Sequence, residues 1–305
     1  MARSESGKGA RARKRTGGQA DRRTSGRAGT RTNGRADKRA GAPAHRGTGE
    51  PAGERTRVLV SREGGVATLV LNRPDKRNAL DRQTIAELRA ALTACDLAAD
   101  VRVVVLRGAG EDFCAGLDLA ELLASADLPP EENERRAMEL GDIFVALRAL
   151  PKVTVAVVRG RALAGGCGLA SACDLVVAHP AARFGYPEIQ RGFVPAMVMT
   201  MLRRAAGEKV AFDLAATGRV LTADEALRAG LVSRVLSARR FESEVTKLLA
   251  MLAGLSASAL ALTKQQFYRL DGVGFAEGVR LGAQVNTVAR QTPDFRAFIA
   301  AFLKK

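Results

Sequence analysis

Two glycine-rich segments are the parts of the sequence whose residue types could do chemistry. They run from Gly108 to Asp118 and from Gly160 to Gly168. Each follows a short, β-branched apolar run and is expected to lead into a helix, so each can point backbone N–H groups outward from a helix N-terminus. Two such donors that converge on one point would form an oxyanion hole, which stabilises negative charge developing on a carbonyl oxygen. The same glycines would also suit tight strand-to-helix turns with only a packing role.

Several other chemistries are disfavoured by the sequence. In the first segment the third glycine of a dinucleotide fingerprint would fall at Phe113, and no Gly-Lys-Ser/Thr of a phosphate loop follows. The chain holds two histidines, which disfavours Ser-His or Cys-His catalysis. Its four cysteines have no Cys-x-x-Cys spacing, so we expect reduced thiols and no metal site. Proton transfer would therefore rest on Asp, Glu, Lys, Cys or Tyr side chains.

Alternating strand and helix patterns are expected to position these two segments. The expected strands are a hairpin of Val58–Val60 and Val66–Leu71, followed by Val103–Leu106, Val153–Val158 and Leu175–Ala178. The expected helices include one that Asp81 caps and one over Glu131–Arg148. From Ala196 onward the pattern is helical except at Leu231–Leu236. This order predicts an α/β core with a helical C-terminal part.

A series of motifs resembles the enoyl-CoA hydratase/isomerase (crotonase) family. The motifs are Leu71-Asn72-Arg73-Pro74 with Asn78-Ala79-Leu80, Phe113-Cys114-Ala115-Gly116-Leu117-Asp118-Leu119, Gly160-x-Ala162-Leu163-Ala164-Gly165-Gly166-Cys167 with Cys173-Asp174-Leu175, Phe184-Gly185-Tyr186-Pro187-Glu188, and Ala223-Asp224-Glu225-Ala226 with Gly230-Leu231-Val232. They occur in the family's order and spacing. The resemblance runs from about residue 57 to the C-terminus, so residues 1–55 lie outside it.

The resemblance implies a crotonase-like α/β fold, a spiral of ββα units followed by a C-terminal helical trimerisation region. Two such homotrimers would often pair into a hexamer, a dimer of trimers. The implied substrate is an acyl-CoA thioester, so coenzyme A is part of the substrate and no separate cofactor is expected. The thioester oxygen would accept hydrogen bonds from the backbone N–H groups of Leu117 and Gly165. The residues implied to bind the coenzyme A part are Lys76, Arg77, Ala79, Leu80 and Ala115.

The carboxylates decide among the family's reactions. Hydratases of this family usually carry two glutamates, whose positions here are Gly168 and Glu188, so one glutamate is missing. Glu188 is expected to be the catalytic acid/base, because apolar neighbours would raise its pKa; the alternative is a structural ion pair. A second acid could come from Glu139 or Asp142, which would otherwise form the solvated face of a helix.

Three classes of function remain open at this point. The leading one is a lyase that hydrates a 2-enoyl-CoA, including a branched one such as the 3-methylglutaconyl-CoA of leucine degradation or an intermediate of fatty acid metabolism. The second is an isomerase that shifts a Δ3 double bond to Δ2 with a single glutamate, or another crotonase reaction. The third is a non-catalytic or RNA-associated protein that resembles a hydratase.

Positive charge is concentrated at one end of the 305-residue chain, whose net charge is +16. Residues 1–55 hold 15 Lys and Arg against 5 Asp and Glu, and contain no Val, Ile, Leu, Phe, Tyr or Trp. We therefore expect a disordered basic extension at 1–55, a core at 56–254 and a helical region at 255–305. The extension could be inconsequential or could contact nucleic acid unspecifically. No long apolar run predicts a membrane span or a secretory signal, so we expect a cytoplasmic protein.

Overall fold

The computed structural model describes residues 55–304. The expectation of a disordered extension at 1–55 therefore lies outside the described residues, except for Arg55. Within residues 55–304 no single helix is long and apolar enough to cross a membrane; helices Ala238–Ala253 and Ala257–Arg269 reach that length only when taken together as a bent pair.

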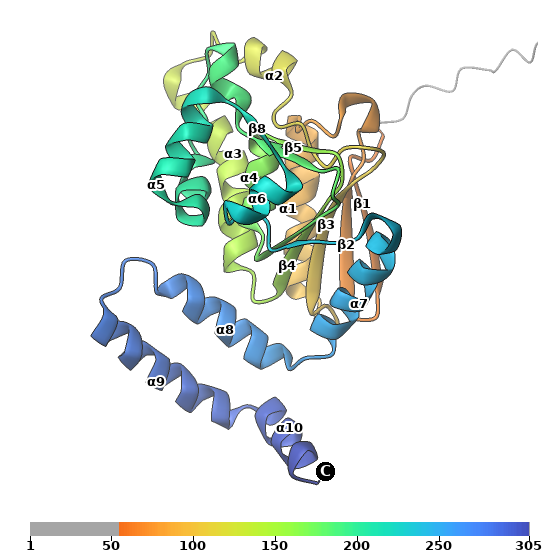
Figure 1. Ribbon diagram of the computed structural model, residues 1–305, viewed down its shortest axis with the longest axis vertical. Helices are drawn as coiled ribbons and strands as arrows, with labels where there is room; N and C mark the ends of the chain where they lie inside the picture. Colours follow the sequence, from red (N-terminus) through yellow and green to blue (C-terminus); the bar gives the residue numbers. More distant parts are fainter. Residues whose placement is uncertain (1–54, 305) are drawn as a thin grey trace, which may run out of the picture. The chain divides into compact units, whose positions relative to one another are not determined.

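A six-stranded sheet, with strand order β1-β2-β3-β4-β6-β9, forms the centre of the fold (Figure 1). The strands are β1 (Val58–Glu63), β2 (Val66–Leu71), β3 (Val103–Gly108), β4 (Val153–Val158), β6 (Leu175–Ala178) and β9 (Arg234–Val235). The expected hairpin of β1 and β2 is confirmed as an antiparallel pair, and β2, β3, β4 and β6 run parallel. The carboxyl ends of β2, β3 and β4 consequently lie at one edge of the sheet. Segments 72–81, 109–118 and 159–168 all leave from that edge.

Helices cover both faces of this sheet because successive strand residues point to opposite sides. Val104 and Leu106 of β3 belong to one apolar cluster, with buried residues of α1 (Arg82–Leu97), α3 (Pro130–Ala149) and α4 (Gly165–Ala172). Val103 and Val105 belong to another, with α7 (Phe241–Ala253). The predicted cap of α1 is confirmed, because the Asp81 carboxylate accepts a hydrogen bond from the Thr84 N–H at 2.7 Å. α3 matches the helix expected over Glu131–Arg148.

A second sheet corrects two sequence-based expectations. Its three strands, in spatial order, are β5 (Arg161–Leu163), β7 (Arg183–Gly185) and β8 (Val220–Thr222). The segment expected to be one long loop from Gly160 to Gly168 therefore contains β5 and the first turn of α4. The part of the chain expected to be helical from Ala196 onward, except at Leu231–Leu236, is also interrupted by β8. Leu231–Leu236 itself contains β9, and the N–H groups of Leu231 and Val232 both donate to the Ala226 carbonyl at the end of α6 (Ala223–Arg228).

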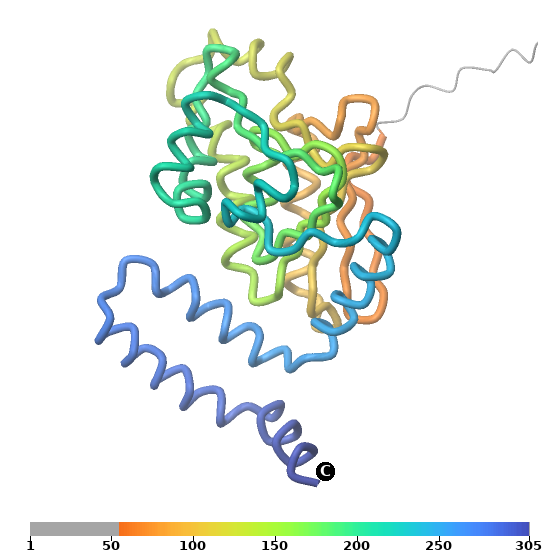
Figure 2. Tube along the Cα trace, viewed as in Figure 1, coloured from red at the N-terminus to blue at the C-terminus, as the bar shows by residue number. Residues whose placement is uncertain are grey.

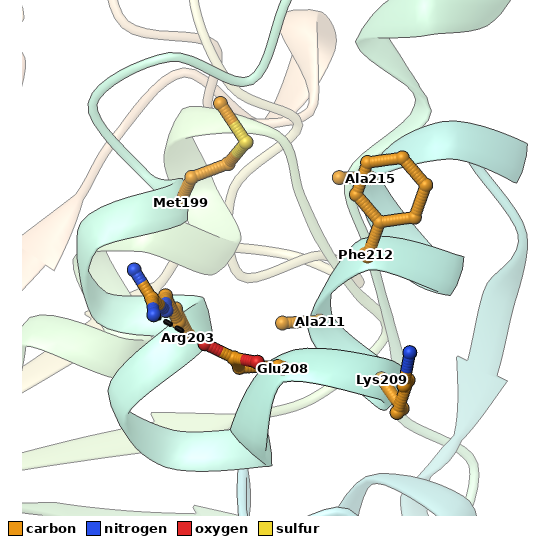
Figure 3. Close-up of a pocket in the computed structure, with 7 residues that line it drawn as sticks. All are labelled: Met199, Arg203, Glu208, Lys209, Ala211, Phe212 and Ala215. Carbon is orange, nitrogen blue, oxygen red and sulfur yellow. Dashed lines mark hydrogen bonds and ion pairs between the residues drawn. The ribbon is translucent and has the colours of Figure 1, made fainter.

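Short elements connect the sheets, namely η1 (Pro74–Lys76), α2 (Leu119–Ala124), η2 (Pro187–Arg191) and η3 (Ala238–Arg240). α5 (Met199–Thr217) follows η2 and is kinked at Gly207, whose φ of 70° and ψ of 169° are not helical. A cavity of about 490 Å³ lies between the two halves of α5 (Figure 3). Its lining residues are Met199, Arg203, Glu208, Lys209, Ala211, Phe212 and Ala215. None of the site residues expected from the sequence lines this cavity.

Three helices form the C-terminal part, α8 (Ala257–Arg269), α9 (Phe275–Gln291) and α10 (Pro293–Leu303) (Figure 2). α8 is anchored to the core by the buried Lys264 ammonium group, which donates to the carbonyls of Leu147 and Lys152 at 2.7 and 2.9 Å and lies 2.8 Å from the Asp174 carboxylate. The Tyr268 hydroxyl donates to the same carboxylate at 2.8 Å. By contrast, α9 and α10 have no buried residue.

Candidate active site

The two glycine-rich segments lie side by side in the structure. Cys114 and Ala162 form a parallel bridge, in which the Cys114 N–H donates to the Arg161 carbonyl at 3.0 Å and the Leu163 N–H to the Cys114 carbonyl at 2.9 Å. On its other side the first segment pairs with Leu80, whose N–H donates to the Gly116 carbonyl at 2.8 Å. The first segment is therefore held as an extended strip between the second segment and the turn that follows β2.

Leu117 and Gly165 meet where this strip crosses the start of α4. Gly116 has a φ of 99°, and a Cβ atom built on it would lie 3.3 Å from the Gly165 nitrogen and 2.8 Å from the Ala164 Cβ. A Cβ built on Gly165 would lie 3.8 Å from the Leu117 nitrogen. The glycine at 116 is thus required both by its positive φ and by the close approach of the two segments.

The N–H groups of Leu117 and Gly165 are also free to bind a ligand. Neither donates to a backbone or side-chain acceptor within residues 55–304. Gly165 is the first residue of α4, where a helix N–H has no acceptor inside the helix and the helix dipole favours negative charge. The arrangement can therefore hold one oxygen that carries negative charge. Gly166, by contrast, has a packing role, because a Cβ built on it would lie 2.3 Å from the Cys114 carbonyl oxygen.

Glu188 lies in η2, directly after the second sheet. It is half-buried, and its Oε2 atom is buried without a hydrogen-bond partner in the described part of the chain. Burial raises the pKa of Glu188, and the charge of Arg191 opposes this shift. Burial raises the pKa of the Cys167 thiol in α4 to about 11, and the charge of Glu188 also raises it. A carboxylate with a raised pKa and one oxygen without a hydrogen-bond partner is suited to accept and return a proton.

The residues implied to bind coenzyme A lie along the turn after β2. Lys76 and Arg77 have exposed side chains, and Leu80 is buried. The Arg77 carbonyl accepts a hydrogen bond from the Ala115 N–H at 3.0 Å, which ties this turn to the first glycine-rich segment. Ala79, in the same turn, is half-buried. The structure therefore brings all five of these residues into one strip beside Leu117.

Two buried polar residues that shape this strip were not singled out from the sequence. Asn78, with a φ of 55°, accepts from the Arg73 N–H at 2.9 Å and donates to the carbonyls of Ala109 and Asp112 at 2.9 and 2.7 Å. The Arg73 guanidinium donates to the Asp118 carboxylate at 3.0 Å. The sequence signal for both residues was their place in the turn motif around Pro74. Their hydrogen-bond partners lie up to 45 positions away in the sequence, so no local pattern reveals these contacts.

The other carboxylates considered from the sequence are engaged elsewhere. Glu139 forms ion pairs with Arg82 at 3.3 Å and Arg135 at 2.9 Å. Asp142 lies 3.8 Å from the Arg89 guanidinium and is exposed. These contacts match the solvated-face interpretation.

The position of the missing glutamate has no room for a side chain. A Cβ built on Gly168 would lie 2.4 Å from Cγ1 of Val198 and 3.1 Å from Cζ of Phe144, both buried. The space beside Gly168 is therefore apolar and filled. Within residues 55–304 there is also no group of three His, Cys, Asp or Glu side chains arranged to hold a metal ion.

Comparison with known proteins gives the family of this site. Residues 61–305 match the family model described as enoyl-CoA hydratase/isomerase. The chain is 43% identical over 243 residues to a Thermus thermophilus protein named "Putative enoyl-CoA hydratase", an alignment that covers 80% of this chain and 96% of that protein. It is 36% identical over 251 residues to the 2,3-dehydroadipyl-CoA hydratase of Escherichia coli K12, with 82% and 96% covered.

Solved structures give the same result for the fold. The crystal structure of enoyl-CoA hydratase from Mycobacterium smegmatis superimposes with a TM-score of 0.78 at 32% identity, and covers 82% of this chain and 97% of that one. The mixed α/β core with its helical C-terminal region is the crotonase fold, as the motifs indicated. This chain is therefore a member of the enoyl-CoA hydratase/isomerase family and an enzyme of that family.

Proposed function

We propose that this enzyme hydrates 2-enoyl-CoA thioesters, adding water across the C2=C3 double bond. The observations that carry the proposal are the pair of unengaged N–H groups of Leu117 and Gly165 and the half-buried Glu188 carboxylate, whose Oε2 atom has no hydrogen-bond partner in the described part of the chain. The thioester oxygen would accept both N–H groups, and the exposed cations of Lys76 and Arg77 would contact the phosphates of coenzyme A. The enzyme would need no metal and no separate cofactor.

The proposed reaction uses Glu188 twice. As a base, the Glu188 carboxylate takes a proton from water while the water oxygen bonds to C3 of the substrate. The electron pair of the double bond then moves onto the thioester oxygen, where the two N–H groups stabilise the enolate. Protonated Glu188 returns the proton to C2 and the thioester carbonyl re-forms. Hydrogen and hydroxyl are thus both added, and Glu188 ends as a carboxylate.

Isomerisation of a 3-enoyl-CoA is the second candidate, favoured by the single carboxylate at this site. Val198 and Phe144 fill the space beside Gly168, and Glu139 is paired with arginines. Isomerisation needs one base only: Glu188 would remove a proton from C2 and return it to C4, with a dienolate held by the same N–H groups. A single proton shuttle is therefore sufficient for this reaction.

A substrate panel tests both candidates. We expect the full-length protein to convert crotonyl-CoA to 3-hydroxybutyryl-CoA, and a parallel assay of 3-methylglutaconyl-CoA tests branched substrates. Conversion of a 3-enoyl-CoA to its 2-enoyl isomer, without hydration of either 2-enoyl-CoA, would favour the isomerase. Failure to convert any of the three, by a correctly folded protein, would contradict the proposed function. Dialysis against a chelator should leave the rate unchanged.

We also infer that the enzyme works as a homotrimer or as a hexamer of two trimers. The support is the exposure of large apolar side chains in the C-terminal helices, among them Phe275 at 90% and Phe302 at 74%, in α9 and α10, which bury no residue of their own. A second copy that packed on these helices would remove this apolar surface from water. Light-scattering mass in solution distinguishes a monomer from three or six copies.

A further inference from the structure

A buried hydroxyl pair connects the element that carries Glu188 to the helix that carries Gly165. Tyr186 is fully buried, and its hydroxyl lies 3.2 Å from the Ser171 hydroxyl. Tyr186 directly precedes η2 and lies two positions before Glu188. Ser171 lies in α4, which begins at Gly165. The hydroxyl pair therefore spans the two halves of the site.

Tyr186 is fully buried, and its hydroxyl stays neutral there. Burial is the main cause that raises the pKa of Tyr186, and the Glu188 charge also raises it, so the phenol stays protonated and neutral. The same charge acts on Cys167, one turn before Ser171. Tyr186 and Cys167 are therefore both buried groups whose pKa the charge of Glu188 raises.

We propose that Tyr186 and Ser171 are positioning residues: their hydrogen bond fixes η2 against α4 and thereby sets the place of the Glu188 carboxylate relative to the oxyanion hole. This inference rests on the proposed function. Two further contacts limit how η2 can move, because the Ala164 N–H donates to the Gly185 carbonyl at 2.9 Å and Pro187 is buried. The hydroxyl pair adds a side-chain contact between η2 and α4 two positions before Glu188.

The expected effect follows from the sensitivity of proton transfer to distance. A displacement of about 1 Å at a reacting group can cost roughly 10²-fold in rate. Loss of one hydroxyl loosens η2 without removing it, so we expect a fall of about 10-fold in kcat with KM changed less than about 2-fold. KM should change little because binding of the coenzyme A part does not depend on the position of Glu188.

The test compares Tyr186→Phe, Ser171→Ala and the double variant with wild type. Each single variant should lower kcat by a similar factor, and the double variant should be no worse than either, since all three remove the same hydrogen bond. Tyr268→Phe is the matched control, because it removes a hydroxyl that binds Asp174 at the other end of the core. This control should keep kcat at the wild-type value.

A second readout does not depend on turnover. Titration of Glu188 by nuclear magnetic resonance with labelled glutamate should show its raised pKa falling toward the ordinary value in Tyr186→Phe, because a loosened η2 admits water. An unchanged Glu188 pKa, or a wild-type kcat in both single variants, would overturn the inference even if crotonyl-CoA is turned over. An additive double variant would also overturn it. If Tyr186→Phe fails to fold, Ser171→Ala, whose residue is only half-buried, decides the question.

Discussion

At the scale of single residues, Glu188 combines two properties that rarely occur together on a surface-accessible carboxylate. Its pKa is raised by burial, and one of its oxygens is buried without a partner. A buried group that lacks a hydrogen bond lowers the free energy of unfolding, so such a group persists where function needs it. This argues for the acid/base role over a structural ion pair, although Arg191 contributes an attractive charge.

Replacing Glu188 with Gln should separate activity from stability. Glu188→Gln keeps the size of the side chain and removes the proton acceptor, so we expect turnover to fall by roughly 10²-fold or more with CoA-ester binding almost unchanged. Steady-state kinetics and calorimetric titration with a product thioester measure the two quantities. Glu139→Gln is the control and should keep near-normal turnover, because Glu139 is paired with two arginines. Equal turnover of the two variants would contradict the assignment of Glu188 as the acid/base.

The same variant should respond to pH in a defined direction. The folded pKa of Glu188 is raised above its unfolded value of about 4.3, so the folded state binds this proton more tightly than the unfolded state. The resulting stabilisation is present below the unfolded pKa and is lost as pH rises through the folded pKa. Glu188→Gln avoids this loss, so its Tm should exceed that of wild type near neutral pH and match it at about pH 4. A lower Tm at neutral pH would instead indicate a structural role.

Gly165 offers a test of the oxyanion hole. Proline is tolerated at the first position of a helix, so Gly165→Pro removes the N–H donor with the least disturbance of α4. Loss of one such donor typically costs on the order of 10²–10³ in rate. Gly274→Pro is the matched control, since Gly274 precedes α9 with a φ of −66° and open space around it. Circular dichroism checks folding, and near-normal turnover of a folded Gly165→Pro protein would disprove the hole.

At the scale of elements, the sequence predicted the strands and the helix cap whose signals lie within a few residues of each other. β1 to β4 and the Asp81 cap are confirmed, because period-2 or continuous β-branched runs and a capping side chain act within a few residues. β5, β7 and β8 were missed, since each has three residues and exists only through its pairing in the second sheet. The contact of Tyr186 with Ser171 was also invisible to sequence, because it depends on how η2 docks on α4.

The anchoring of α8 is likewise non-local, and Lys264 should account for much of it. Lys264, a residue that is 7% exposed, loses its ammonium group in Lys264→Met, which leaves the Asp174 carboxylate without its ion-pair partner. Breaking a buried pair typically costs about 3–5 kcal/mol, so thermal unfolding should begin roughly 10 °C lower. Lys247→Met, on the exposed side of α7, is the control and should leave Tm unchanged. An equal effect of both variants would refute the anchoring role.

At the scale of the whole molecule, the basic segment and the folded region should be separable. Residues 1–55 contain no large apolar residue that could add to a core, so deletion of residues 1–54 should leave Tm and turnover intact. The deleted protein should elute from heparin at lower salt, because counterion release scales with the cations that contact the polyanion. Salt-gradient chromatography and thermal unfolding measure both effects. A marked fall in Tm would show that the segment contributes to the fold.

Because Val198 and Phe144 fill the space beside Gly168, a second carboxylate cannot enter this site by one substitution. A glutamate at 168 should disrupt the site, since its Cβ alone would lie 2.4 Å from a Val198 methyl group. Val198→Ala removes that methyl and leaves contacts no closer than the 3.1 Å to Phe144. An evolutionary path to a two-glutamate site would therefore run through position 198 first. Gly168→Glu should be tolerated only in a protein that already carries Val198→Ala. The order in which the two substitutions can be acquired is therefore constrained.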